Sequence, residues 1–245
     1  MNEWQQHAIY PDWQPHLRVR ALVTTRLGGV SMAPFDSLNL GDHVGDAPDA
    51  VAHNRARVAA ALPAAPLWLS QVHGTTVVDA ATAADGVEAD AVVAFAPGRV
   101  CAIMTADCLP VLLARRDGKG VGAAHAGWRG LCNGVLEATV VRLGGGTGVE
   151  AWLGPAIGPT AFEVGEEVRA AFMQHDAAAA AAFQPGGIPG KWWADIYLLA
   201  RQRLAQAGVT AVSGGGLCTV TDAARFYSYR RERETGRMAS MIWLE

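Results

Sequence analysis

The sequence predicts an α/β fold in a single domain that covers residues 1–245. The chain has 245 residues, a length that fits one large domain. Hydrophobic residues make up 51% of it, so the chain can bury a sizeable core without disulfides or metal staples. Segments with strand-like and helix-like patterns alternate along the sequence with no long linker between them. This alternation is typical of one compact α/β domain.

Short apolar runs separated by turn-forming residues dominate the first part of the chain. Residues 19–25 are apolar and β-branched and are followed by a pair of glycines, which predicts a strand. Residues 32–46 hold many turn formers and predict an irregular loop. Residues 117–120 have the composition of a hairpin turn. The other expected strands are residues 67–69, 75–78, 91–95, 100–104, 110–114, 121–124 and 151–153.

Helices are expected where helix-forming residues lie between turn signals. The first covers residues 49–62, with Asp49 as its N-cap and Pro63 beyond its end. Residues 195–207 have the clearest amphipathic pattern, and a glycine ends them. The alanine tract at residues 177–182 is either helical or a surface insert. Two further helices are expected at residues 132–143, which precede three glycines, and at residues 165–173.

Charge and cysteine usage limit the classes of function and compartment. The net charge is −3, from 20 basic and 23 acidic residues spread along the chain, so nothing favours nucleic acid or an anionic membrane as a partner. The four cysteines form no CxxC pair, which favours reduced thiols over a disulfide framework. The sequence shows neither a signal-peptide pattern nor an apolar run approaching about 20 residues. We therefore expect a soluble cytoplasmic protein.

One cysteine and two histidines are the candidate metal ligands and catalytic residues. His73, Cys108 and His125 each stand at the edge of an apolar run, close to a glycine or a proline. Such strand ends and loop mouths are where sites are usually assembled. Thiolate and imidazole are ligands that zinc prefers, and three protein ligands leave a fourth position open. Although their spacing matches no local zinc-finger motif, we expect these side chains to converge on one metal ion.

Three other interpretations of these residues stay open at the level of sequence. Cys108 can be a small buried hydrophobe, with each histidine an ordinary polar residue. Cys108 can instead be a nucleophile with His125 as its base, which requires no metal. Copper is the third possibility, but the chain has seven histidines and no His-x-His pair. It can therefore supply one ion and not a cluster of coppers.

Candidate substrate-binding residues come from loop-like and motif-like stretches. An arginine fork binds phosphate or carboxylate through two parallel hydrogen bonds. Asn39 and His43 lie in the irregular loop, where they either contact a ligand or stabilise the loop through backbone hydrogen bonds. The arginines in such stretches are Arg26, Arg55, Arg129, Arg230 and Arg231.

Nine sequence motifs occur in order along the chain, namely SLNLGDHVGD, HNR, SQVHG, ADAVV, TADCLPVLL, HAGWRG, GPAIGP, CT and SYRRERETGR. Together they closely resemble those of the YfiH family, also called multicopper polyphenol oxidases or laccase-domain proteins. The resemblance runs from about Thr24 to Trp243 and therefore covers nearly the whole chain. One departure is the pair Ala161 and Phe162 before Glu163, where the family usually has a small residue and then tyrosine.

The resemblance implies a function and a fold. It implies one zinc ion per chain, bound by His73, Cys108 and His125, and an α/β fold of mixed sheets flanked by helices. It also implies purine nucleoside phosphorylase activity, in which adenosine or inosine reacts with phosphate to give the base and ribose 1-phosphate. Adenosine deaminase and methylthioadenosine phosphorylase activities accompany it in the family. The partners would thus be a small-molecule nucleoside and phosphate.

Two alternative activities are kept beside this one. The first is a copper-dependent polyphenol oxidase, with Cu²⁺ in place of zinc. The second is a thiol hydrolase that uses Cys108 on cytoplasmic peptidoglycan precursors, because some members of the family are linked to the editing of such precursors.

Overall fold

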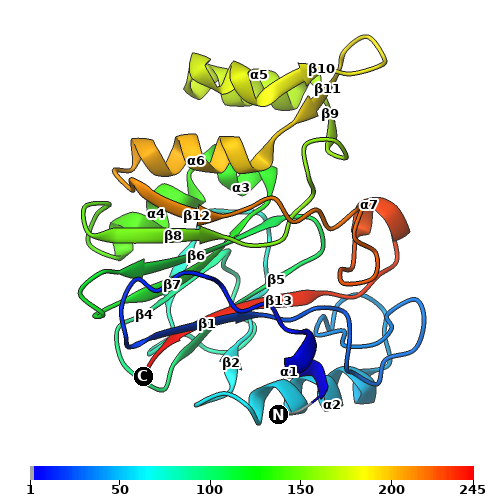
Figure 1. Ribbon diagram of the computed structural model, residues 1–245, viewed down its shortest axis with the longest axis vertical. Coiled ribbons are helices and arrows are strands. Elements are labelled where there is room, and N and C mark those ends of the chain that lie inside the picture. The colour runs from blue at the N-terminus through cyan, green and yellow to red at the C-terminus, as the bar shows by residue number, and fades with distance from the viewer. Residues whose placement is uncertain (1–2) are drawn as a thin grey trace.

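A six-stranded sheet and a four-stranded sheet pack face to face in the computed structural model, which describes residues 3–245 (Figure 1). Apolar side chains from both sheets meet in one buried cluster, which includes Ile103 and Ile242 from one sheet and Leu112 and Trp152 from the other. Burial of this shared face is the main force that holds the sheets together. The expected α/β class with mixed sheets is confirmed.

The six-stranded sheet has the order β12-β8-β6-β7-β4-β3. The outer pairs β12–β8 and β3–β4 are parallel, and the inner pairs are antiparallel. The predicted turn at residues 117–120 joins β6 to β7, and the Arg115 amide donates to the Gly120 carbonyl there. The strands are β3 (Val77–Asp79), β4 (Ala91–Ala94), β6 (Leu109–Arg115), β7 (Val121–Ala126), β8 (Val149–Leu153) and β12 (Ala211–Gly214).

The four-stranded sheet has the order β1-β13-β5-β2. Strand β13 lies between β1 and β5 and pairs with both in antiparallel fashion, so the first and last strands of the chain lie side by side (Figure 1). All seven side chains of β13 are buried. The strands are β1 (Val19–Val23), β2 (Pro66–Leu67), β5 (Val100–Thr105) and β13 (Met238–Leu244).

Helices cover the outer faces of the two sheets. Helices α3, α4 and α6 share a core cluster with the six-stranded sheet, and α1 and α2 lie beside the four-stranded sheet (Figure 1). No helix within residues 3–245 is both long and apolar enough to cross a membrane. The helices are α1 (Glu3–His7), α2 (Pro48–Ala59), α3 (Trp128–Asn133), α4 (Val135–Arg142), α5 (Glu166–His175), α6 (Ile196–Gln206) and α7 (Tyr229–Glu232).

A small three-stranded sheet lies with α5 at the end of the molecule opposite α1 and α2 (Figure 1). Its order is β10-β11-β9, and both pairs are antiparallel. The alanine tract at Ala177–Ala182 forms a 3₁₀ helix beside it, so of its two interpretations the helical one is correct. The strands are β9 (Glu163–Gly165), β10 (Phe183–Pro185) and β11 (Lys191–Ala194).

Several expected boundaries were wrong for local reasons. The helix expected at residues 132–143 is two helices, because Gly134 adopts a left-handed φ of 102° that ends α3 and begins α4. Asp49 is not the N-cap of α2. Ala47 occupies that position and Pro48 begins the helix, where its fixed φ suits the first turn. The sequence pattern also missed β13, β12 and the whole three-stranded sheet.

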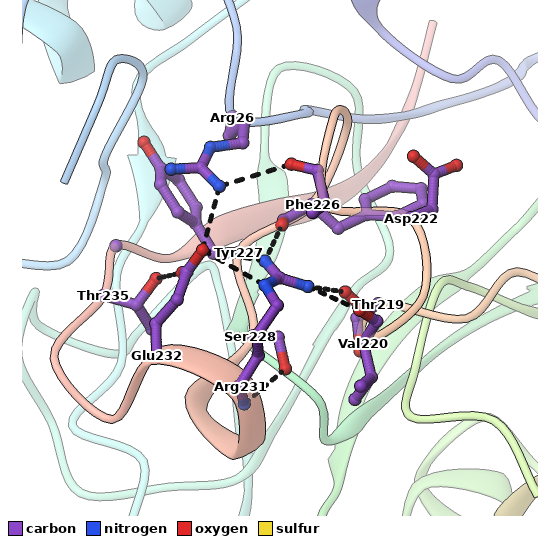
Figure 2. A network of polar contacts seen from close by, with 12 residues as sticks. Arg26, Thr219, Val220, Asp222, Phe226, Tyr227, Ser228, Arg231, Glu232 and Thr235 are labelled. Atoms are coloured by element: carbon purple, nitrogen blue, oxygen red, sulfur yellow. Dashed lines mark hydrogen bonds and ion pairs between the residues drawn. The ribbon is translucent and has the colours of Figure 1, made fainter. Parts of the chain in front are cut away.

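A network of arginines and carbonyls fastens α7 to the rest of the molecule (Figure 2). The Arg26 guanidinium pairs with Glu232 at 3.1 Å and lies over the Tyr227 ring. The Arg231 guanidinium donates to the carbonyls of Thr219, Val220 and Phe226 and pairs with the same Glu232 carboxylate. Both arginines are therefore occupied by the protein itself, and their joint role is to fix α7 at the edge of the fold.

We predict that Glu232→Gln lowers the free energy of unfolding at pH 7 by about 1 kcal/mol. Burial raises the pKa of Glu232, but Thr235, Arg231 and Arg26 outweigh burial and lower it. A lowered folded-state pKa gives stability that is complete above the unfolded pKa and is lost as the pH falls through the folded pKa. The difference between parent and variant should therefore begin to shrink as the pH falls below about 4.5, the ordinary glutamate pKa, and should vanish below the lowered folded-state pKa. Urea titration across pH measures it, with the exposed Glu234→Gln as the matched control.

Candidate metal centre and cavity

The three side chains expected to bind a metal lie together in the structure. His73 comes from the loop between β2 and β3, Cys108 directly precedes β6, and His125 lies on β7. Their potential ligand atoms all lie within 4.8 Å of one another. The Cys108 Sγ is 3.7 Å from His73 Nε2, and the ring centroids of the two histidines are 4.7 Å apart. Among residues 3–245 this is the one group of three such side chains that could hold an ion.

The buried carboxylate of Asp90 sets the positions of both histidines. Its oxygens accept hydrogen bonds from the backbone amides of His73 at 2.9 Å and Gly74 at 2.6 Å. The His125 Nδ1 also bonds the carboxylate, at 2.8 Å, so Nε2 is the ring nitrogen that is left to bind a metal ion when the ring is neutral. Burial raises the pKa of Asp90, but the bonds from His125 and Gly74 outweigh burial and lower it. The ionised carboxylate is thus the stable form of this link.

The loop that carries His73 is held in an unusual conformation. His73 has a φ of 62°, a left-handed value that non-glycine residues rarely adopt. The side-chain amide of Gln71 donates to the Met104 backbone carbonyl and accepts from the Met104 backbone N–H, both at 2.8 Å. These two bonds fasten the loop to the end of β5, and the bonds to Asp90 complete its support. The surrounding contacts therefore offset the cost of the left-handed backbone.

Gly127 leaves the space in which the three side chains meet. A Cβ at this position would lie 2.6 Å from His73 Cδ2 and 3.2 Å from Cys108 Sγ. The first approach is closer than side chains tolerate, and the second would require the sulfur to shift by a few tenths of an ångström. A glycine immediately before α3 is therefore a geometric requirement of the site.

Thiol and imidazole shift each other's pKa in this cluster. Burial raises the pKa of Cys108, but the positive His125 and the bond to His73 bring it down to about 6. Burial lowers the pKa of His125, whereas Cys108 and Asp90 raise it to about 9. At neutral pH the cysteine is therefore a thiolate, which is the form that binds metal ions.

The donor set fits a mononuclear metal site. Two imidazoles and one thiolate match the ligands that zinc prefers, and Asp90 orients one imidazole from behind, as is usual at metal sites. All three side chains also line a cavity of about 400 Å³. A fourth coordination position would therefore face space that a small ligand can enter.

The lining of this cavity combines apolar side chains with cationic ones. Asp107 is the one carboxylate among residues 3–245 that lines it. Its two oxygens accept bonds from the Thr219 hydroxyl and the Arg230 amide, each at 2.6 Å. The apolar lining consists of Met104, Ala106, Trp128, Ile157, Phe162 and Ile196, and the arginines are Arg129, Arg230 and Arg237.

Three of the seven candidate substrate-binding residues line the cavity, namely His43, Arg129 and Arg230. The other four lie outside its lining. Asn39 is fully buried and bonds to its own loop. Arg55 lies over the Trp68 ring and pairs with Asp42. Arg26 and Arg231 are bonded within the protein as described above, so all four are occupied by contacts with the protein itself.

Arg237 lines the cavity but did not emerge from the sequence as a candidate. In the β13–β5 register, Met238 pairs with Thr105, so Arg237 lies beside the segment that leads to Cys108. Burial lowers the pKa of Arg237, and negative charge on Cys108 and Asp107 opposes that shift. The signal that could have found Arg237 is the position of its TGR motif immediately before the last strand.

Fold and site together define a class of protein, a mixed α/β sandwich with a His₂Cys site beside a small-molecule cavity. The chain belongs to the family described as multi-copper polyphenol oxidoreductase laccase, whose sequence model matches residues 20–245. The resemblance to the YfiH family is thereby confirmed.

Named relatives and a solved structure match nearly the full chain. A Pseudomonas aeruginosa protein named purine nucleoside phosphorylase is 59% identical over 246 residues, which cover 100% of both chains. The Escherichia coli K12 purine nucleoside phosphorylase YfiH is 56% identical, over 96% of this chain and 98% of its own. A Neisseria meningitidis crystal structure superposes with a TM-score of 0.93 at 49% identity, over 98% of this chain and 99% of that one.

We predict that Asp90→Asn weakens zinc binding by about 10- to 100-fold, because His125 loses its ionised partner. Competition with a chromogenic chelator measures the affinity. Asp117→Asn, at the β6–β7 turn, is the control, and its affinity should equal that of the parent. Parent-like affinity in Asp90→Asn would show that the carboxylate does not support the ligands.

Gly127→Ala should fold but bind zinc at least about tenfold more weakly, because the new methyl group occupies the space of the His73 ring. Gly187→Ala is the matched control, since a Cβ there meets nothing within 4 Å. Zinc content after dialysis and circular dichroism are the two measurements. A Gly127→Ala variant with full zinc content would contradict the proposed packing.

Proposed function

We propose that this chain is a cytoplasmic, zinc-dependent purine nucleoside phosphorylase that works as one catalytic domain. The observation that carries the proposal is a single cavity that combines a His₂Cys donor set, an apolar wall and arginines. It is supported by full-length relatives that bear the name purine nucleoside phosphorylase. Adenosine deaminase and methylthioadenosine phosphorylase activities belong to the same proposal as activities of the same site.

The cavity residues suit the requirements of phosphorolysis. In this reaction a phosphate oxygen forms a bond to the ribose C1′ while the bond from C1′ to the purine breaks. Trp128 and Phe162 offer flat apolar surface against which a purine ring can pack. The arginine side chains offset the charge of phosphate and of the transition state. His73, Cys108 and His125 would hold zinc, which when bound supplies a Lewis acid beside this space.

Copper oxidase chemistry is the less favoured alternative. A multicopper centre needs several imidazole-rich ligand groups, whereas one group of three candidate ligands occurs within residues 3–245. A thiol hydrolase that acts on peptidoglycan precursors is the other alternative. The lowered pKa of Cys108 favours it, since a thiolate is also a nucleophile.

The test is to incubate zinc-replete protein with adenosine or inosine and phosphate and to separate the products by chromatography. We expect free purine base and ribose 1-phosphate. Cys108→Ser should lower kcat/KM by more than about 100-fold through loss of the metal. Cys218→Ser, a cysteine outside the cavity lining, is the control.

Three outcomes separate the alternatives. Absence of any released base from all nucleosides would overturn the phosphorylase proposal. Copper rather than zinc in protein purified without added metal would favour the oxidase. Activity that survives chelation but not thiol alkylation would favour the hydrolase.

A further inference from the structure

The three arginines of the cavity differ in how many of their donors the protein already uses. Both terminal nitrogens of Arg230 donate to the Glu163 carbonyl at 3.1 Å, and one also reaches the Ala161 carbonyl. Arg230 therefore fastens the wall that carries Phe162. Arg129 is exposed and lies over the ring of its neighbour Trp128, with 4.5 Å from the guanidinium carbon to the ring centroid. No hydrogen bond to residues 3–245 fixes the Arg129 guanidinium.

Arg237 is anchored on one side and open on the other. Its Nη1 donates to the carbonyls of Thr235 at 2.9 Å and Gly236 at 3.0 Å. Its Nε and Nη2 have no hydrogen-bond partner in the described part of the chain, residues 3–245. These two nitrogens form the side edge of the guanidinium, which presents two parallel N–H groups. That edge matches two oxygens of a phosphate.

Asn39 holds the backbone of Arg237 in place, and Gly41 lies against the stem of its side chain. The Asn39 Oδ1 accepts from the Arg237 amide at 2.9 Å and from the Gly41 amide at 2.9 Å. Its Nδ2 donates to the Gly41 carbonyl and to the Asp46 carboxylate. A Cβ at Gly41 would lie 2.8 Å from Arg237 Cγ. The loop that contains Asn39 is thus shaped around the side chain of Arg237.

Arg237 brings a positive charge to the cavity that holds the three candidate metal ligands, on the segment that pairs with the end of β5. Asp107, the cavity's carboxylate among residues 3–245, bonds Thr219 and Arg230 and makes no hydrogen bond to the Arg237 side chain. The Nε and Nη2 edge of Arg237 is therefore not occupied by a carboxylate of the described lining.

We infer that Arg237 binds the phosphate co-substrate through its Nε and Nη2 edge, and that Asn39 is the positioning residue that holds it there. This inference rests on the proposed phosphorylase function. Asn39 then acts by positioning the phosphate-binding arginine. It does not contact the substrate directly, which was one of the two roles considered for it from the sequence.

The experiment measures KM for phosphate and for inosine separately in zinc-replete parent, Arg237→Gln, Arg237→Lys and Asn39→Ala. Arg237→Gln should raise the phosphate KM by about tenfold or more and leave the inosine KM within about twofold. Arg237→Lys keeps the positive charge but loses the two parallel N–H groups. Its phosphate KM should therefore lie between those of the parent and Arg237→Gln. Asn39→Ala should raise the phosphate KM selectively, whereas loss of general stability would lower kcat without this selectivity.

Arg225→Gln is the matched control, because that arginine lies outside the cavity lining and bonds Asp222. A phosphate KM in Arg237→Gln equal to that of the parent would overturn the inference, as would a rise confined to the inosine KM.

A binding measurement keeps this inference separate from the proposed function. Calorimetry with inorganic phosphate is carried out on zinc-replete parent and Arg237→Gln, whether or not the parent cleaves nucleosides. At least about tenfold weaker phosphate binding in the variant supports the inference even where turnover is absent. Equal affinities, or no binding of phosphate to the parent, overturn it.

Discussion

The carboxylate of Asp90 is the interaction on which the site depends. It is completely buried just before β4, yet it accepts bonds from three consecutive backbone amides of the His73 loop and from the His125 ring. A buried carboxylate is tolerable only when such donors replace water. Because these donors belong to two separate segments, one anion fixes the distance between the two histidines. It supports the left-handed backbone of His73 and leaves Nε2 as the ring nitrogen of His125 that can bind a metal ion.

The sequence was sufficient to identify the side chains whose chemistry suits a metal site. It did not identify residues that reach the site only through the pairing of distant strands. A thiol and two imidazoles at strand ends point to a metal without any structure. Asp90 looks like an ordinary strand-flanking carboxylate, because its partners are known only when β4 lies beside β7. Arg237 reaches the cavity through the pairing of β13 with β5. Neither register can be read from local composition.

The fold shows the same division. The fold class and most strands of the first half could be predicted from the length of the apolar runs and from the residues that bound them. Those runs end at glycine, proline or a clear hairpin turn. Strand β13 is buried on both faces and therefore lacks the alternation that marks a strand. The strands of the three-stranded sheet are three or four residues long and partly exposed, too short for any period to emerge.

The position of β13 between β1 and β5 also governs the order in which the site can be completed during synthesis. His73, Cys108 and His125 leave the ribosome long before β13, so a growing chain can bring the metal ligands together first. Until β13 arrives, one edge of β5 remains unpaired and open to other chains. The last strand therefore has two effects at once: it closes an aggregation-prone edge and it delivers Arg237 to a cavity whose other wall already exists.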